Sequence, residues 1–361
     1  MAHVAVVGAG GNIGSHLVPH LARASGLSRV TLIDRDRYES DNLHTQDIDK
    51  RDIGHPKADV QARRLHRING GLEVAALNIA VEDVPLGALR ADVMLACLDS
   101  RRARLVVNQA AWRLGVPWIN AGVDGSDLLV RIQTFLPAPD AACLECAWDQ
   151  IDYDAVEQDY PCGTGASSAP TNAPSSLGAL AASLQAIECE KLLAGHTGQT
   201  LAGRDLMIDA RHHRQFVTAF HRNPNCRMPD HNGWHIARLD APASRLKLRA
   251  LVVMKADQEA GEQVMFRVAG QRIVLTLTCQ KCGASRETFR LERSLRKASI
   301  CHHCGTRLRP SGFDLCDAAP LSAAPRSSLD LPLSRLGVRP GDVFSLTTPS
   351  TEERCEVGGE S

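Results

Sequence analysis

Over roughly the first 240 residues, short apolar runs alternate with segments that are apolar on one face only. The runs at residues 4–7, 29–34, 73–77 and 92–98 are rich in Val, Leu, Ile and Ala. Such runs are typical of strands buried on both faces of a parallel sheet. With helices between them, they predict an α/β fold built on a Rossmann-like doubly wound sheet.

The intervening segments carry apolar residues at helical spacing, for example Ile13, Leu17 and Leu21 after the first strand. Helices are predicted over residues 12–25, 56–69, 100–114 and 175–193, and further strands over 117–122, 128–136 and 204–220. A chain of 361 residues exceeds the usual size of one domain, so a second domain is expected.

From about Ala241 the pattern changes to short alternating runs, at 245–255 and 262–279, which suggest a small β-rich domain. A stretch rich in Ala, Pro and Ser then resembles a linker. The predicted division is a first domain at 1–240, a β-rich domain at 241–315, a linker at 316–330, and a short structured segment with a polar tail at 331–361.

A glycine-rich turn, Gly8-Ala-Gly10-Gly11, follows the first strand directly. Glycines let backbone N–H groups approach a phosphate closely, and the helix after them adds its positive N-terminal dipole. Asp34 ends the next strand, where a carboxylate can accept hydrogen bonds from ribose hydroxyls. This pattern predicts a nucleotide site, although the spacing to Gly14 is one residue longer than the dinucleotide fingerprint and a simple tight turn stays open.

Two further residues stand where a nucleotide site would place charge. Lys57 falls in the first turn of a predicted helix, where a cation is disfavoured unless an anionic ligand is near. Asp99 follows the apolar run 92–98, and open α/β sheets bind ligands beyond such strand ends. Asp99 is either the N-cap of the next helix or a magnesium ligand.

Six of the 12 cysteines stand in three Cys-x-x-Cys pairs, which points to zinc in a reducing compartment. Two of these pairs are separated by 18 residues, and each ends in glycine. Their spacing is that of a structural zinc ribbon. The predicted ligands are Cys279, Cys282, Cys301 and Cys304.

The third pair, Cys143 and Cys146, needs two more ligands to complete a tetrahedral site. Cys226 supplies a third thiolate after the run 204–220. His231 is the preferred fourth ligand, with His235 as the alternative. A buried pair of free cysteines remains the other reading of Cys143 and Cys146.

Composition narrows the classes of partner. Lys plus Arg and Asp plus Glu number 41 each, so no overall field attracts nucleic acid or an anionic membrane. Aromatic residues make up 4%, which disfavours a platform for stacking bases. The chain opens on a strand and has no apolar stretch long enough to span a bilayer. We expect a cytoplasmic protein without membrane or nucleic-acid partners.

Several of these motifs occur together and in a fixed order. They are Gly8-Ala-Gly-Gly, Asp34-x-Asp36, Ser40-Asp-Asn42-Leu-x-x-Gln46, Gly54-x-Pro-Lys57, Cys97-Leu-Asp99 with Arg104, Cys143-x-x-Cys146, and Leu184-Gln-Ala-Ile-Glu188-x-x-Lys191. In this combination the chain resembles the ThiF/MoeB/HesA family of adenylyltransferases, which activate ubiquitin-like and sulfur-carrier proteins. The resemblance covers roughly residues 3–231.

The resemblance implies a function for each motif. The glycine loop and Asp34 would hold ATP, Asn42 and Lys57 would contact its phosphates, and Asp99 would hold Mg²⁺. The carrier's terminal carboxylate would become an acyl-adenylate with release of pyrophosphate. The resemblance further implies a homodimer, and a downstream conjugating or sulfur-donor protein as a possible partner.

Two positions qualify the resemblance. The family usually has Arg before the Gln of the Asn-Leu-x-Arg-Gln loop, whereas this chain has Thr45, so Arg37, Arg51 or a partner subunit would have to supply that cation. Cys162 lies in a small-residue loop where the resemblance places a cysteine that accepts the activated carboxyl group. A thioester at Cys162 is therefore an expectation, although no nearby base is visible.

Two other functions remain open at this point. A nicotinamide-dependent oxidoreductase would use the same glycine loop and Asp34, but it leaves Lys57, Asp99 and the first zinc site unexplained. A non-catalytic, zinc-stabilised interaction protein with a relic nucleotide domain would fit Thr45 and the appended ribbon.

Overall fold

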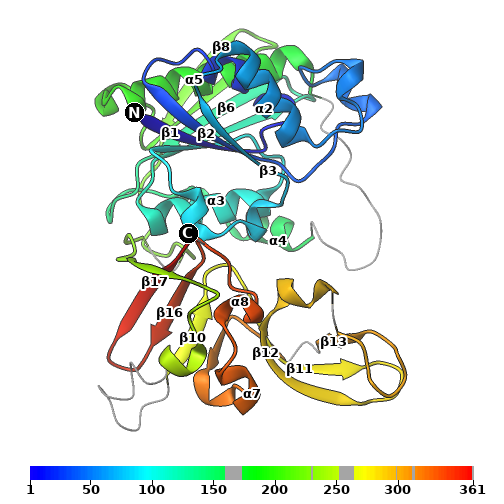
Figure 1. Ribbon diagram of the computed structural model, residues 1–361. Coiled ribbons are helices and arrows are strands. Elements are labelled where there is room, and N and C mark those ends of the chain that lie inside the picture. Colours follow the sequence, from blue (N-terminus) through cyan, green and yellow to red (C-terminus); the bar gives the residue numbers. More distant parts are fainter. Residues whose placement is uncertain (159–172, 229–230, 252–263, 298, 311–313, 360–361) are drawn as a thin grey trace. The chain divides into compact units, whose positions relative to one another are not determined.

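The structure is a computed structural model, which describes residues 1–158, 173–228, 231–251, 264–297, 299–310 and 314–359 (Figure 1). It divides into two compact units. Unit 1 comprises Met1–Glu82 and Leu89–Trp234, and unit 2 comprises Asp83–Ala88 and His235–Ser361.

Unit 1 is built on one eight-stranded sheet with the order β3-β2-β1-β4-β5-β6-β7-β8. In this order, the first five strands (β3, β2, β1, β4 and β5) are parallel to one another. The strands from β5 to β8 are antiparallel to their neighbours. The strands are β1 Ala2–Val7, β2 Leu27–Ile33, β3 Glu73–Leu77, β4 Val93–Ala96, β5 Trp118–Asp124, β6 Leu129–Phe135, β7 Arg204–Asp209 and β8 Arg214–Ala219. The strand order reverses at β1, so a crevice for ligands is expected between the ends of β1 and β4.

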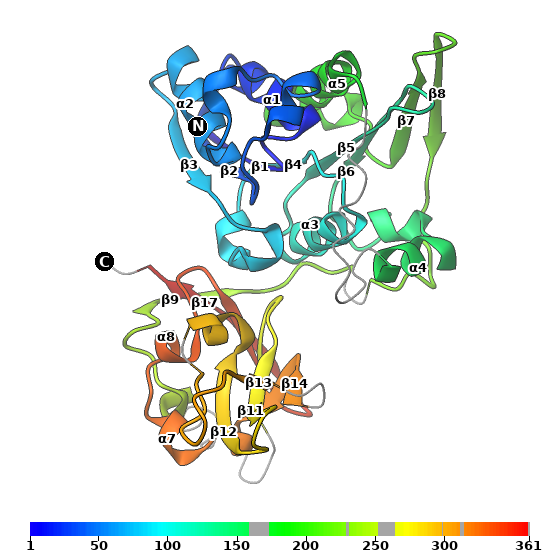
Figure 2. The same cartoon turned by 90° about the vertical axis from the view of Figure 1, so that its right-hand side faces the viewer.

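Helices cover both faces of this sheet (Figure 2). The α-helices are α1 Asn12–Leu21, α2 Lys57–Ile68, α3 Arg101–Leu114, α4 Gln150–Gln158 and α5 Ser175–Leu193; two 3₁₀ turns, η1 Ser40–His44 and η2 Lys50–Asp52, lie between β2 and α2. Helices α1, α2 and α5 lie on one face and α3 on the other. The predicted α/β, Rossmann-like doubly wound architecture is confirmed.

Some local predictions differ from the structure. The predicted strand 204–220 is the hairpin of β7 and β8, because the chain turns through residues 210–213, with His213 at φ 53°. Helix α1 ends at Leu21, four residues earlier than predicted. Helix α4 was not predicted.

Helix α1 packs on α5 through a glycine. A Cβ atom at Gly178 would lie 1.8 Å from Asn12 Oδ1 and 2.9 Å from the Asn12 carbonyl oxygen. Next to this contact, Leu17 and Val18 of α1 and Leu177 and Ala181 of α5 belong to the main apolar core of unit 1. The close approach of the two helices therefore requires glycine at position 178.

We expect Gly178→Ala to destabilise unit 1 by about 1–3 kcal/mol, because overpacking forces neighbouring groups to shift. Urea denaturation of the full chain measures this change. Gly198→Ala is the matched control, since a Cβ atom there meets nothing within 4 Å. Equal stability of the two variants would show that the α1–α5 contact adapts freely.

Unit 2 contains two β-sheets. The first has the order β15-β10-β16-β17-β9, and the second joins β12, β11 and β13, with β14 also paired to β11. The strands are β9 Ala237–Pro242, β10 Met265–Val268, β11 Ile273–Cys279, β12 Ser285–Leu291, β13 Leu308–Pro310, β14 Leu315–Cys316, β15 Ala318–Pro320, β16 Val343–Thr347 and β17 Glu352–Gly358; two short helices are α7 Arg326–Leu329 and α8 Leu333–Leu336. The expected β-rich character is confirmed.

The chain is divided differently from the sequence-based scheme. Residues 316–330, expected as a linker, carry β15 and α7, and Ala319 and Leu321 are part of the apolar core of unit 2. The polar tail forms β17, which pairs with β9 in parallel. The part of 245–255 that the structure describes forms a turn and a short helix.

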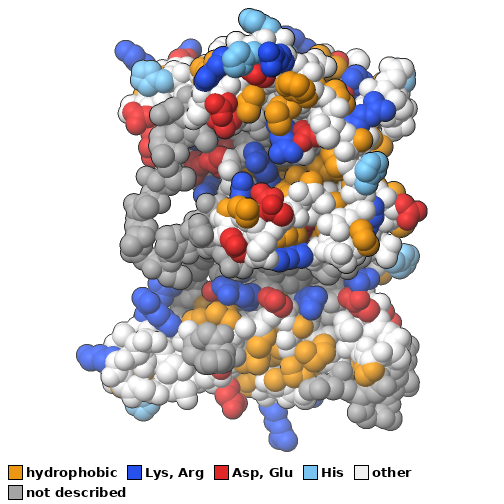
Figure 3. Space-filling model, turned by 180° about the vertical axis from the view of Figure 1, so that it is seen from behind, with side chains coloured by type: hydrophobic (Ala, Val, Ile, Leu, Met, Phe, Trp, Pro, Cys, Tyr) orange, Lys and Arg blue, Asp and Glu red, His pale blue; other side chains and the backbone are white. Residues whose placement is uncertain are grey.

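Acidic and basic side chains are interspersed on the face shown in Figure 3, as the balanced composition predicts. Within the described residues, no helix combines the length and the apolar character needed to cross a membrane.

Candidate nucleotide and zinc sites

The glycine loop links β1 to α1 at the point where the strand order reverses. Gly8 has φ +81°, and a Cβ atom there would lie 2.4 Å from the Cys97 carbonyl oxygen. A Cβ atom at Gly14 would lie 2.2 Å from the Gly8 carbonyl oxygen. Gly8 therefore allows the loop to approach the end of β4 closely, while Gly14 serves the packing of α1 on the loop.

Asp34, at the end of β2, is fixed against this loop. Its Oδ2 accepts the Gly10 N–H at 2.9 Å, and its Oδ1 accepts the Asp36 N–H at 3.0 Å. The side chain is only 8% exposed, and burial raises the pKa of its carboxyl group, opposed by these two hydrogen bonds and by the charge of Lys57. Asp34 and the glycine loop, both proposed from the sequence as parts of one nucleotide site, thus lie in direct contact.

Lys57 is the first residue of α2, and the residue is 8% exposed. Its Nζ lies 5.5 Å from the ring centroid of Tyr38, whose hydroxyl accepts a hydrogen bond from Gln61 Nε2 at 2.7 Å. A Cβ atom at Gly10 would lie 2.4 Å from the Lys57 Cβ, so the lysine packs directly on the glycine loop. Within the described residues, no carboxylate forms an ion pair with its ammonium group. A buried, unpaired cation is suited to an anionic ligand.

Asn42 lies in the loop that joins β2 to α2. Its Oδ1 accepts the Glu39 N–H at 2.9 Å, which caps η1. Asn42 makes no direct contact with the glycine loop among the described hydrogen bonds. Any contact of Asn42 with a bound ligand therefore depends on how the loop as a whole is held.

Asp99 follows β4 and is exposed. The N-cap of α3 is Ser100, whose Oγ accepts the Ala103 N–H at 3.3 Å, so Asp99 is not needed as the cap. Arg104 donates to the Leu98 carbonyl oxygen at 2.5 Å; burial lowers its pKa to about 10, while the Asp99 charge acts in the opposite direction. Arg104 stays charged at neutral pH and lies within the field of Asp99.

The first cysteine cluster gathers residues that are far apart in sequence. The ligand atoms of Cys143, Cys146, Cys226 and His231 all lie within 4.8 Å of one another. Cys143 Sγ is 3.7 Å from Cys226 Sγ, and Cys146 Sγ is 3.9 Å from His231 Nε2. A tetrahedron with bonds of about 2.3 Å has edges of about 3.8 Å, so this donor set fits Zn²⁺. His235 is exposed and outside the cluster, which favours His231 as the fourth ligand.

The second cluster is the ribbon of unit 2. Cys279 Sγ lies 3.4 Å from Cys304 Sγ, and Cys282 Sγ lies 3.5 Å from Cys301 Sγ. All four sulfur atoms lie within 4.8 Å of one another. Four thiolates at these separations are the donor set of a structural zinc site.

Three residues that sequence reasoning did not single out help to shape the nucleotide site. Tyr38 lies under the ammonium group of Lys57, Gln61 holds Tyr38, and Arg64 binds the loop that carries Asn42. Lys57, Gln61 and Arg64 stand at positions i, i+4 and i+7 of one helix, so they share a face. A row of polar residues at this spacing was the available signal. Cys162 lies outside the described residues.

Comparisons with known proteins identify relatives of unit 1. The model of the ThiF family matches residues 1–228. The sulfur carrier protein adenylyltransferase of Thermus thermophilus is 32% identical over 231 residues, which are 62% of this chain and 81% of the relative. The sulfur carrier protein ThiS adenylyltransferase of Escherichia coli is 30% identical over 226 residues, covering 62% of this chain and 84% of the relative.

A solved structure supports the fold. The crystal structure of E. coli MccB with ATP has a TM-score of 0.50 and 23% identity, and the match covers 63% of this chain and 66% of that one. The family match extends over more than half of the chain, and the site residues from Gly8 to Asp99 lie within it. The chain therefore belongs to the ThiF family, and its relatives named here are adenylyltransferases.

Proposed function

We propose that this chain uses ATP to adenylate the C-terminal carboxylate of a ubiquitin-like or sulfur-carrier protein. The observation that carries the proposal is Lys57, a residue that is only 8% exposed, packs on a glycine loop at the sheet's switch point and, within the described residues, forms no ion pair with a carboxylate. Family membership supports the same activity, since the named relatives adenylate carriers of this class.

In this proposal ATP lies along the crevice between the ends of β1 and β4. The glycine loop with Gly8, Gly10 and Gly11 has no side chains at these positions to keep the phosphates away, and α1 adds its N-terminal dipole. Asp34 keeps lone pairs for the ribose hydroxyls beyond the two amides that it accepts. Lys57 and Asn42 then neutralise and orient the phosphate chain.

Asp99 is proposed to hold Mg²⁺. It is exposed at the strand end, it does not cap α3, and a carboxylate oxygen is a ligand that Mg²⁺ prefers. The bound ion would withdraw charge from the phosphate oxygens. Arg104, held on the Leu98 carbonyl, keeps a fixed positive charge near that carboxylate.

The reaction joins one carboxylate oxygen of the carrier to the α-phosphorus of ATP. The bond between the α-phosphorus and the bridging oxygen breaks, and pyrophosphate leaves with that electron pair. Such a displacement requires in-line positioning and charge neutralisation more than covalent help from the protein. Lys57 and the N-terminus of α1 are placed to neutralise the charge of the phosphates.

Both cysteine clusters are proposed to hold Zn²⁺ in structural roles, because all four positions of each are taken by protein ligands. Clustered thiolates of this kind persist in a reducing compartment, which supports the cytoplasm as the location. Homodimerisation, a later thioester at Cys162 and a downstream conjugating or sulfur-donor protein stay predictions of the family resemblance.

ATP–pyrophosphate exchange tests the proposal. The full chain should exchange labelled pyrophosphate into ATP only when Mg²⁺ and a small carrier protein encoded near its gene are both present. The same carrier with an amidated C-terminus is the control, because it lacks the attacking oxygen anion. Binding of NAD(H) without ATP would instead indicate an oxidoreductase, and binding of neither nucleotide would indicate an interaction protein.

A further inference from the structure

Among the described residues, one residue makes the polar contacts between the loop that carries Asn42 and the helices beside it. Between Ser40 and Ile48, hydrogen bonds such as Gln46 N–H to the Asn42 carbonyl at 2.8 Å are local. Within the described residues, the non-local polar contacts of this segment all belong to Asp47. Asp47 is therefore the polar link between this loop and the helices beside it, and its contacts help to position Asn42.

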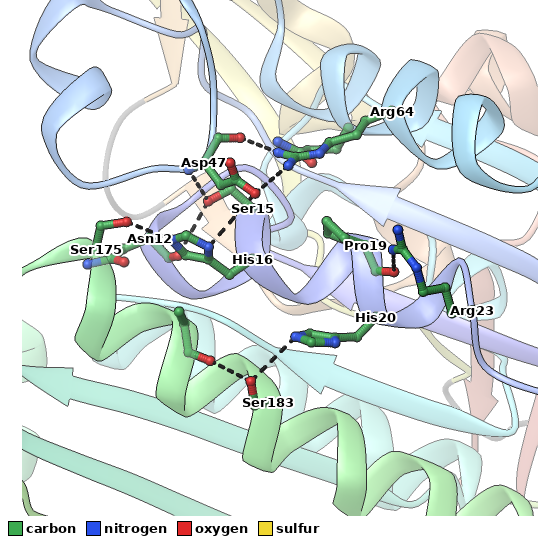
Figure 4. A network of polar contacts seen from close by, with 12 residues as sticks. Asn12, Ser15, His16, Pro19, His20, Arg23, Asp47, Arg64, Ser175 and Ser183 are labelled. Carbon is green, nitrogen blue, oxygen red and sulfur yellow. Dashed lines mark hydrogen bonds and ion pairs between the residues drawn. The ribbon is translucent and has the colours of Figure 1, made fainter.

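Three groups meet at Asp47 (Figure 4). Its backbone N–H donates to Ser15 Oγ at 3.0 Å, in the first turns of α1 just after the glycine loop. Arg64 of α2 donates both to the Asp47 carbonyl oxygen and to its carboxylate. The third group, His16, has its Nδ1 3.9 Å from the carboxylate and its Nε2 2.9 Å from Ser175 Oγ.

The charges at this junction single out one ion pair. Burial lowers the pKa of His16, so its ring is neutral at pH 7. The charged partner of Asp47 is then Arg64, whose side chain is 25% exposed. A two-pronged contact from a partly buried guanidinium fixes orientation as well as charge.

Arg64 also shares a helix face with Lys57. The two residues are seven positions apart on α2. The helix that carries the ammonium group proposed to bind phosphate therefore also holds the Ser40–Ile48 loop. Helix α1 supplies Ser15 on the other side. Asp47 thus joins the loop to both helices that border the glycine turn.

We propose that Arg64 and Asp47 are positioning residues for ATP, forming an ion pair that holds the Ser40–Ile48 loop, and Asn42 with it, over the phosphate site. This inference rests on the proposed use of ATP. Arg64 does not take over the role of the arginine that is usual at Thr45, because its guanidinium is paired with Asp47. Arg37 and Arg51 are engaged as well, since Arg37 donates to the Gly54 carbonyl oxygen at 2.8 Å and Arg51 pairs with Asp49.

Positioning through Asp47 differs from direct contact between Arg64 and ATP. If Arg64 acts through Asp47, removing either partner frees the loop, and removing both costs no more than removing one. If Arg64 binds phosphate itself, Asp47→Ala releases its guanidinium and ATP affinity stays the same or rises. The two possibilities therefore give opposite results for Asp47.

The experiment measures ATP dissociation constants for the full chain in the presence of Mg²⁺, for Arg64→Ala, Asp47→Ala and the double variant. We expect each single variant to bind ATP about tenfold more weakly, and the double variant to match them, because the coupling energy then equals one single effect. Arg64→Lys should recover part of the affinity, since one charged contact remains. Melting temperatures measured alongside should not follow this ranking.

Arg63→Ala is the matched control, because Arg63 is exposed on the same helix and should leave affinity unchanged. Ser15→Ala, which removes the acceptor of the Asp47 N–H, provides a second variant should an ion-pair variant fold poorly, and it should also weaken ATP binding. Unchanged or tighter binding by Asp47→Ala, or additive effects in the double variant, would overturn the proposal.

Hydrogen exchange separates this inference from the proposed function. In the nucleotide-free chain, Arg64→Ala should speed exchange of the Asp47 and Gln46 amides, while amides of β1 keep their protection. A wild-type chain that fails to bind ATP contradicts the proposed function. Unchanged exchange at Asp47 contradicts the tether itself, whichever nucleotide binds.

Discussion

Asp99→Ala is expected to abolish magnesium-dependent adenylation, with a loss on the order of a hundredfold or more in exchange rate. The carboxylate is the proposed ligand for Mg²⁺, and alanine offers no oxygen in its place. The fold should remain intact because Asp99 is exposed and Ser100 caps α3. ATP–pyrophosphate exchange, measured against Mg²⁺ concentration, gives the readout.

Asp127→Ala is the control for this substitution, because Asp127 is an exposed acid in the turn between β5 and β6. It should exchange as the wild type does. Asp99→Asn keeps the side-chain shape and one oxygen, so it should retain weak activity at high Mg²⁺. Undiminished exchange by Asp99→Ala would remove this residue from the site.

The second large effect expected is the loss of the ribbon when its zinc is removed. The apolar cluster around the ribbon is small, and Cys279 and Cys301 are themselves two of its six buried residues. Structural zinc contributes about 10–16 kcal/mol to the folding of zinc-finger peptides, far more than so small a cluster can replace. Cys301→Ser should therefore expose the amides of β11 to β13 to rapid exchange.

Elemental analysis measures the number of zinc ions per chain in the same variants. We expect two zinc ions per wild-type chain and one in Cys301→Ser, because the cluster at Cys143 is separate. Cys316→Ser is the control, since Cys316 lies on β14 outside both clusters, and it should keep both ions. One ion in the wild-type chain would mean that the mixed cysteine and histidine site is not a zinc site.

Local signals explain which elements could be predicted from sequence. Helix α5 was predicted with the bounds that it has, because Pro174 stands before its first turn and apolar residues repeat along it. The hairpin of β7 and β8 was missed because its turn, Ala210–His213, contains no glycine, proline or asparagine. Strand β17 was missed because its residues, Glu352–Gly358, are mostly polar and form no apolar run, although it pairs with the nearby β16 as well as with β9.

In the candidate site, too, some contacts follow from local sequence signals and others do not. Gly10 and Asp34 were assigned to one site from the sequence and lie in contact, because neighbouring parallel strands bring their ends to one edge of a sheet. Asp47 and Arg64 were not paired, since no rule of spacing links a loop residue to a helix that begins ten positions later. Contacts of this kind depend on the path of a loop, which composition does not specify.

The path of the chain between the two units has a practical consequence for dissection by proteases. Because Asp83–Ala88 belongs to unit 2 and both neighbouring segments belong to unit 1, the backbone passes from one unit to the other three times. A single cut near residue 234 would leave the C-terminal fragment without Asp83–Ala88, including the Gly87 N–H that donates to the Gly341 carbonyl oxygen at 2.8 Å. A recombinant fragment that starts at His235 would thus lack one segment of unit 2, Asp83–Ala88.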